Sequence, residues 1–182
     1  GREHIATASL DPAAVITLGG LSKNYLVPGF RIGWGIISGR EEELREYIEA
    51  ANKLIRARLC ANHPGQWAIR PALEGDQGHL VEFREKLTRR RDLTVEMLNQ
   101  IPRITCVKPE GSFYAFPRLH IDESDNQFVR ELIKETGVVV VPGSGFGQLP
   151  GTSHFRVVFL PAEEILMKAY NKIAEFFETF GK

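Results

Sequence analysis

A lysine and an arginine stand eight positions apart near the start of the sequence, between two segments typical of β-strands. The stretch reads VITLGGLSKNYLVPGFRIGWGII, with Lys23 just after a glycine-rich turn and Arg31 just after a Pro-Gly pair. Partial burial at the end of a strand favours the neutral form of an amine, and a neutral amine attacks carbonyl carbons. The fixed fork of a guanidinium suits a phosphate. The pair therefore predicts a site for an aldehyde that carries a phosphate, and pyridoxal phosphate is the cofactor of that kind.

This stretch resembles the cofactor-lysine motif of the class I and II aminotransferases, the aspartate aminotransferase superfamily, on the residues LSKNYLVPGFRIGW. In that family the lysine of the Ser-Lys step holds pyridoxal phosphate as a Schiff base, and the arginine that follows binds the phosphate. The resemblance implies these roles for Lys23 and Arg31. Many relatives place a phosphate-binding serine where this sequence has Gly20, so Ser22 is the expected hydroxyl. The alanine and archaeal-type branch of the family is the most similar.

Three later segments carry the same resemblance. EGSFYAFP resembles the small-domain strand pair of the family, VVVVPGSGFG resembles a late strand and a loop near the substrate cleft, and HFRVVF resembles the strand with the substrate-binding arginine. That arginine is Arg156 in this sequence. The resemblance implies that Arg156 binds the α-carboxylate of an amino acid through two hydrogen bonds. Without the family, Arg156 could equally be an edge-strand residue whose side chain extends to solvent.

The resemblance also implies the fold class and the function. We expect an α/β chain with a partial fold of the pyridoxal-phosphate-dependent transferases, namely the end of the large-domain sheet plus the α+β small domain. The expected divisions are a remnant of the large cofactor-binding domain over 1–40, interdomain and small-domain helices over 41–102, and the small C-terminal domain over 103–182. Such a chain is the carboxy-terminal part of an aminotransferase that moves an amino group between an amino acid and a 2-oxo acid.

We expect this chain to be inactive alone. Its first residues, REHIATASL, resemble the family segment that directly follows an Asp-Glu-x-Tyr stretch, and that stretch contains the aspartate that protonates the cofactor ring. The aspartate would therefore lie upstream. The full-length protein is expected to be a homodimer, as in the family. Two other functions stay open: the pyridoxal-phosphate-sensing domain of a transcription regulator, and a chain that only folds and dimerises.

The hydrophobic pattern before residue 102 predicts two strands and several helices. Residues 15–18 and 32–37 are β-formers interrupted by glycine, which is typical of strands buried on both faces. A helix is expected to begin near residue 39 or 40, and short or kinked helical turns should follow around Pro64 and Pro71. A long helix over 78–100 should then end before Pro102.

The pattern after residue 102 predicts an alternation of short strands and helices. ITCVKPEGSFYAFP predicts two strands joined by a Pro-Glu-Gly turn. Ser124 and Gln127 form a capping box for a helix that Gly137 would end. The strands VVVVP and HFRVVFLP follow, and a final helix places apolar residues from Ile165 to Phe180 on one stripe. Four further residues are expected in the core: Trp34, Trp67, Cys60 and Cys106.

Composition argues against several function classes. Lysine plus arginine equal aspartate plus glutamate at 23 each, so no excess charge would attract a nucleic acid or an anionic membrane. No apolar run is long enough to span a bilayer, and no signal peptide is seen. The 2 cysteines and 5 histidines have no ligand-like spacing, which predicts no metal site. Two separated cysteines also fit a reducing compartment, so the expected location is the cytoplasm.

Overall fold

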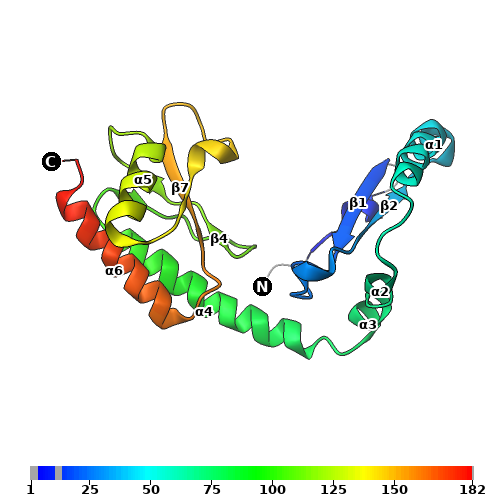
Figure 1. The fold of residues 1–182 in the computed structure, drawn as a ribbon, viewed down its shortest axis with the longest axis horizontal. Coiled ribbons are helices and arrows are strands. Elements are labelled where there is room, and N and C mark those ends of the chain that lie inside the picture. The colour runs from blue at the N-terminus through cyan, green and yellow to red at the C-terminus, as the bar shows by residue number, and fades with distance from the viewer. Residues whose placement is uncertain (1–3, 11–13, 182) are drawn as a thin grey trace. The chain divides into compact units, whose positions relative to one another are not determined.

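The computed structural model describes residues 4–10 and 14–181, except for the side chain of residue 41. Contacts divide the chain into two units, Gly1–Leu80 and Val81–Lys182. The described residues form a two-stranded sheet in the first unit and a five-stranded sheet in the second (Figure 1).

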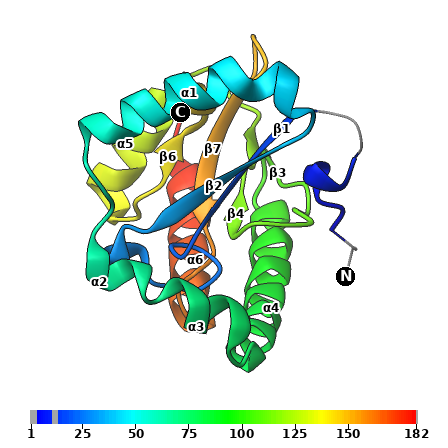
Figure 2. The ribbon, with the colours of Figure 1, turned by 90° about the vertical axis from the view of Figure 1, so that its right-hand side faces the viewer.

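The first unit contains a β-hairpin. β1 (Val15–Gly20) and β2 (Gly33–Ser38) pair antiparallel, from Val15 opposite Ser38 to Gly20 opposite Gly33, and Figure 2 shows the two strands side by side. The other elements are η1 (Thr7–Ser9), η2 (Pro28–Phe30), α1 (Glu41–Ala57), α2 (His63–Gln66) and α3 (Ile69–Glu74). The interrupted helix predicted around the two prolines is therefore present, as α2 and α3.

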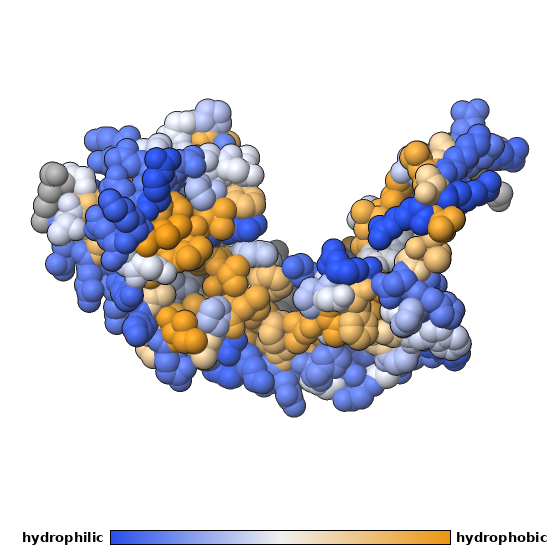
Figure 3. Space-filling model, in the orientation of Figure 1, coloured by the Kyte–Doolittle hydropathy of each residue, from blue (hydrophilic) through white to orange (hydrophobic). Residues whose placement is uncertain are grey.

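The prediction that both hairpin strands are buried is wrong for the described residues. Leu18 is 80% exposed and Ile36 is 54% exposed. The reason is that β1 and β2 pair only with each other among the described strands, and a two-stranded ribbon leaves side chains open on both faces. Apolar residues are accordingly visible on the surface of this unit (Figure 3).

Trp34 packs against the glycine opposite it in the hairpin. Gly19 pairs with Trp34, and a Cβ built on Gly19 would lie only 2.4 Å from the indole Nε1. The indole therefore needs a glycine at this position, and Trp34 is half-buried. The other two core predictions for this unit are wrong, because Trp67 is 73% exposed and Cys60 is exposed.

The sheet of the second unit is organised around its longest strand, β7 (Ser153–Val158). β4 (Tyr114–Ala115) and β5 (Arg118–Leu119) pair with the two ends of β7, and β3 (Ile104–Thr105) pairs with β5. Between β4 and β5, the Phe155 amide donates to the Pro117 carbonyl at 3.1 Å. β6 (Val141–Pro142) also pairs with β7, through Arg156 and Phe155.

The two strands predicted on either side of the Pro-Glu-Gly turn are present as β3 and β4, but they do not form a hairpin. β3 and β4 do not pair with each other, because each finds another partner strand. Both ends of the segment 114–119 pair with β7, so their backbone groups find partners there. The pairing of short strands depends on such distant partners rather than on the turn between them.

Three helices and a short 3-10 turn complete the second unit: α4 (Gly78–Gln100), α5 (Asp125–Thr136), η3 (Gly143–Phe146) and α6 (Glu163–Thr179). α4 has the predicted bounds. The Ser124 hydroxyl accepts from the Gln127 amide at 3.1 Å, and Gly137 ends α5 with a φ of 72°, as the sequence predicts. The Gln127 side chain does not complete the capping box, because it donates to Glu131 instead.

The core of the second unit is rich in aromatic residues. Phe128 on α5 is fully buried, and its ring centre lies 5.6 Å from that of Phe155 on β7 and 5.2 Å from that of Phe177 on α6. Phe155 and Val157 face this core. Because successive side chains of a strand point to opposite faces, His154 and Arg156 point to the other face of the sheet. The core therefore fixes which face carries Arg156.

Candidate functional site

The loop between β1 and β2 carries all three residues predicted to bind the cofactor. Ser22 and Lys23 follow β1, and Arg31 comes just before β2. The base of the loop is closed by a hydrogen bond from the Leu21 amide to the Ile32 carbonyl, at 3.1 Å. Leu21 and Ile32 are both buried, so they anchor the loop. The fold thus brings an amine, a hydroxyl and a guanidinium onto one connection.

Lys23 lies in the turn that opens this loop. Its side chain is exposed and that of Ser22 is half-buried. The expectation that Lys23 is partly buried is therefore wrong for this chain alone. The turn includes Leu26, which has a φ of 58°. A non-glycine residue in the left-handed region costs roughly 1 kcal/mol or more, and such strain persists only where surrounding contacts hold the backbone.

Arg31 also has left-handed backbone geometry. It follows η2 with φ 52° and ψ 41°, and its Nη1 donates to the Pro28 carbonyl at 2.8 Å. This bond fixes the side chain along the loop and leaves other donors of the guanidinium for a ligand. Arg31 also lines a cavity of about 350 Å³ together with residues that come from η2 and α2.

Residues 62–65, at the start of α2, contact the β1–β2 loop and support it. The sequence interpretation missed this role. The Asn62 side chain donates to the Phe30 carbonyl at 2.8 Å and also accepts from the Gly65 amide, which caps α2. A Cβ on Gly65 would lie 2.6 Å from a side-chain carbon of Ile32. The available signal was an Asn shortly before a Pro-Gly pair, which is typical of a helix start but says nothing of its distant partner.

Arg156 lies in the second unit, in the middle of β7. β7 has neighbours on both sides at this point, since Arg156 pairs with Val141 on β6 and residues 114–119 run along the opposite edge. The alternative that Arg156 is an edge-strand residue is therefore wrong. The guanidinium carbon lies 4.4 Å from the centre of the Tyr114 ring and 3.9 Å from that of the Phe146 ring.

Within the described part of the chain, Arg156 makes no hydrogen bond or ion pair. Its contacts are with the faces of the two rings, and its buried Nε has no hydrogen-bond partner there. A cation with only aromatic neighbours retains its capacity for an anion, because ring faces do not take its N–H groups in the plane of the fork. The sequence interpretation missed Tyr114 and Phe146. The motifs that contain them are visible in the sequence, but nothing in the sequence indicates that the two rings contact Arg156.

Phe146 sits on η3, and Asp125 holds that turn. The Asp125 carboxylate accepts from the Ser144 amide at 2.6 Å and from the Gln148 side chain at 3.4 Å. Burial tends to raise the pKa of Asp125, but the hydrogen bonds from Ser144 and Asn126 outweigh it and hold the pKa below its ordinary value. Asp125 is therefore a buried carboxylate that remains charged near neutral pH.

His154 lies two residues before Arg156 on the same face of β7. Its ring stacks on Phe116 with centres 4.9 Å apart. Burial and the nearby charge of Arg118 lower the pKa of His154 from its ordinary value, so the neutral ring prevails at pH 7. The exposed face of the sheet thus combines aromatic rings with arginines.

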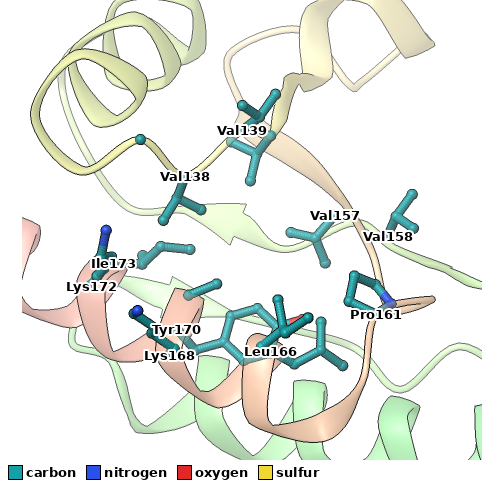
Figure 4. Close-up of a pocket in the computed structure, with 14 residues that line it drawn as sticks. Val138, Val139, Val157, Val158, Pro161, Leu166, Lys168, Tyr170, Lys172 and Ile173 are labelled. Carbon is teal, nitrogen blue, oxygen red and sulfur yellow. The ribbon is translucent and has the colours of Figure 1, made fainter.

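A separate groove of about 370 Å³ is found in the second unit. Figure 4 shows it between the segment after α5, the end of β7 and α6, with valines, Leu166 and Tyr170 around it. Lys172 at its border donates to the Thr136 carbonyl at 2.6 Å. The groove is mainly apolar, and Val157, which lines it, points to the sheet face opposite Arg156.

No cluster of metal-ligating side chains occurs in residues 4–10 and 14–181. Over the same ranges, none of the helices combines the length and the hydropathy that crossing a bilayer requires.

Comparison with known proteins decides the family. The family model described as aminotransferase class I and II matches residues 2–170. The chain belongs to the class I and II aminotransferases. It is similar to the glutamate-pyruvate aminotransferase AlaA of Haemophilus influenzae, with 39% identity over 99% of this chain and 46% of the relative. The alanine aminotransferase of Mycobacterium tuberculosis is 38% identical, over 98% of this chain and 43% of its own length.

A solved structure confirms the fold of this aminotransferase chain. The alanine aminotransferase from Pyrococcus furiosus has a TM-score of 0.92 and 40% identity, over 98% of this chain and 46% of that one. The chain spans about half the length of the curated relatives it matches and corresponds to their C-terminal part. The α/β fold class and the alanine and archaeal-type branch are therefore as predicted. Class I and II aminotransferases depend on pyridoxal phosphate.

Proposed function

We propose that this chain is the C-terminal part of a pyridoxal-phosphate-dependent aminotransferase that exchanges amino groups between L-alanine and a 2-oxo acid. Lys23 holds the cofactor, Ser22 and Arg31 bind its phosphate, and Arg156 binds the substrate carboxylate. Alanine is the proposed amino acid because similar proteins carry the names alanine aminotransferase and glutamate-pyruvate aminotransferase.

The residues of the β1–β2 loop fit the cofactor by their chemistry. The loop presents the amine of Lys23, the hydroxyl of Ser22 and the guanidinium of Arg31, of which Nη1 donates to the Pro28 carbonyl. An amine suits an aldehyde, and a hydroxyl with a guanidinium suits a phosphate. Bound there, pyridoxal phosphate would supply the carbonyl that captures an amino group and the ring that draws electrons from the α-carbon.

Two side chains of this chain would then act on the substrate. Nζ of Lys23 takes a proton from the α-carbon of the amino acid and later returns one, as a general base and acid. Arg156 fixes the carboxylate, which limits rotation of the substrate about its α-carbon and keeps the reacting bond in one orientation. The observation that carries the proposal is the Arg156 guanidinium, which lies over two aromatic rings and has no counter-charge among the described residues.

The 182 residues alone are proposed to be inactive, as part of an enzyme that is a cytoplasmic homodimer when complete. The support is that they span only about half of their relatives. Unpaired Cys60 and Cys106 fit a reducing compartment. The three-part division at residues 40 and 102 also stays a proposal.

Cofactor binding is tested on the chain itself. After incubation with a small excess of pyridoxal phosphate and reduction with borohydride, mass spectrometry should find the adduct on Lys23. The variant Lys23→Ala should lose it. Lys53→Ala is the matched control, because Lys53 is another exposed lysine of the first unit, paired with Glu49. Equal labelling of Lys23 and Lys53 would contradict a dedicated cofactor lysine.

Activity is tested in a chimera in which this chain replaces the corresponding part of the Pyrococcus furiosus alanine aminotransferase. With L-alanine and 2-oxoglutarate, the chimera should form pyruvate, and its Lys23→Ala variant should not. The 182 residues alone should form none. A chimera that folds and binds pyridoxal phosphate but forms no pyruvate would favour the sensing domain of a regulator instead.

A further inference from the structure

The orientation of Arg156 depends on a ring that comes from a distant loop. Tyr114 lies on the neighbouring strand and is fixed by the sheet, but Phe146 is carried by η3. Phe146 is 44% exposed, and its ring lies nearly perpendicular to that of Phe116, with centres 6.4 Å apart. These contacts alone leave the ring weakly held, so the backbone of η3 must keep it over the guanidinium.

Asp125 is the buried charge that holds this backbone. It is 4% exposed, and its Oδ2 accepts from the Ser144 amide and the Gln148 side chain. The neighbouring Asn126 side chain donates to the Ser144 hydroxyl at 3.0 Å. Hydrogen bonds to a charged acceptor are the strong ones, and two residues of the loop share this one carboxylate.

Capping of α5 does not account for Asp125. Ser124 already accepts from the Gln127 amide at the start of the helix. Asp125 uses Oδ1 for its helical neighbour, accepting from the Asn126 amide at 2.9 Å. Its other oxygen turns away from the helix to the loop. A surface aspartate would serve the helix equally well, so the burial of this one points to the loop.

We propose that Asp125 is a positioning residue for carboxylate recognition: it holds η3, η3 holds Phe146, and Phe146 and Tyr114 together hold the Arg156 guanidinium in the orientation that binds the substrate. This proposal rests on the proposed role of Arg156. The clamp limits the guanidinium to one plane, so the carboxylate finds a preorganised partner and less side-chain freedom is lost on binding.

The test is nuclear magnetic resonance on the 182-residue chain with ¹⁵N-labelled arginine. A proton held between two aromatic faces is shifted upfield, so the Arg156 Hε signal should lie upfield of the other arginine signals. Phe146→Leu should reduce this shift. Asp125→Asn should reduce the upfield shift to a similar extent, because an amide has only one oxygen and cannot accept both from Asn126 and from Ser144 and Gln148. Titration with pyruvate should show binding about two- to fivefold weaker in both variants, the value of one exposed cation–π contact.

Asp122→Asn is the matched control. Asp122 is an exposed aspartate three residues earlier, so it undergoes the same change of charge and should keep the Arg156 signal of the unchanged chain. If Asp125→Asn does not fold, Ser144→Pro replaces it. That variant removes the N–H that donates to Asp125, at a first-turn position of η3 where proline is tolerated, and also the hydroxyl that accepts from Asn126.

The outcomes separate this proposal from the proposed function. An unchanged Arg156 signal and unchanged pyruvate affinity in folded Asp125→Asn or Ser144→Pro, with a changed signal in Phe146→Leu, would overturn the role of Asp125. Failure of the unchanged chain to bind pyruvate at Arg156 would instead reject the carboxylate role of Arg156. In that case the Hε shifts alone still decide whether Asp125 positions the guanidinium.

Discussion

The hydroxyl groups of Thr94 and Tyr170 lie 2.9 Å apart and join α4 to α6 inside the second unit. Both side chains are buried. Thr94 donates to the Arg90 carbonyl at 2.7 Å, so Tyr170 must donate to Thr94. Burial raises the pKa of Tyr170 to about 12, which keeps the phenol protonated at neutral pH. The two longest helices around this core are thus linked by a short polar chain.

Tyr170→Phe should lower the free energy of unfolding by about 1 kcal/mol, the typical net value of one hydrogen bond. The loss stays small because Thr94 keeps its bond to Arg90. Urea denaturation followed by circular dichroism measures it. Tyr47→Phe is the control, since Tyr47 is 51% exposed on α1 and should be neutral. Equal stability of both variants would mean that the buried bond adds nothing to the packing.

Gly143→Ala should destabilise the second unit by about 1–3 kcal/mol, as overpacking does. A Cβ at this buried position would lie 2.7 Å from the His154 carbonyl oxygen, which is backbone and cannot move aside. Gly145→Ala two residues later meets nothing within 4 Å and should leave stability unchanged. Thermal melting of both variants makes the comparison. A tolerated Gly143→Ala would show that the packing between β7 and η3 can relax to admit a methyl group.

Acid should weaken the hold of Asp125 on its loop. The pKa of Asp125 in the folded chain lies below its ordinary value, so the folded state favours the carboxylate. The stabilisation is complete above the unfolded pKa of about 3.9 and is lost as the pH falls through the lower folded pKa. The stability difference between the unchanged chain and Asp125→Asn should therefore be largest near neutral pH and shrink below about pH 4.

A second readout of the same change is His154. The charge of Asp125 raises the pKa of His154, against burial and Arg118, which lower it. Asp125→Asn should therefore lower the pKa of His154 further, measured by titrating its ring protons. Asp122→Asn should leave it in place. A higher pKa of His154 in Asp125→Asn than in the unchanged chain would contradict this electrostatic coupling.

Arg156→Lys in the chimera should lower kcat/KM for L-alanine by about 10- to 100-fold, because a lysine offers a point charge in place of a bidentate fork. The comparison is Arg118→Lys on the neighbouring strand, an exposed arginine opposite His154. This control should retain most of the activity. Steady-state kinetics with varied alanine concentration measures both, and equal losses would remove the special role of Arg156.

Local signals predicted the helices well. The long apolar pattern before Pro102 gave the bounds of α4, and Ser124 and Gly137 gave those of α5, since caps act within one turn. Strand pairing was harder. β3 and β4 are two residues each; β3 pairs with β5 and β4 pairs with β7, so the turn between them carries no information about either partner.

The site residues also differ in how far the sequence could predict them. Lys23, Ser22 and Arg31 could be found from one continuous stretch, because a single loop holds them. The surroundings of Arg156 could not, since Tyr114, Phe146 and Asp125 come from three segments that only the folded sheet brings together. The exposure of Lys23 was also missed, because burial depends on the covering residues and not on the motif itself.

The Trp34 indole that lies over Gly19 helps to fix the register of the β1–β2 hairpin. A slip of one residue in the direction that brings Leu18 opposite Trp34 would place a leucine side chain where the indole lies and push the ring off the strand. Because the slip toward Leu18 is disfavoured, the indole favours the register in which Gly20 pairs with Gly33 at the start and end of the loop. The register thereby helps to set the separation in space between the Lys23 and Arg31 backbones before any ligand arrives, and a change in the fluorescence emission of Trp34 would report a loss of this register.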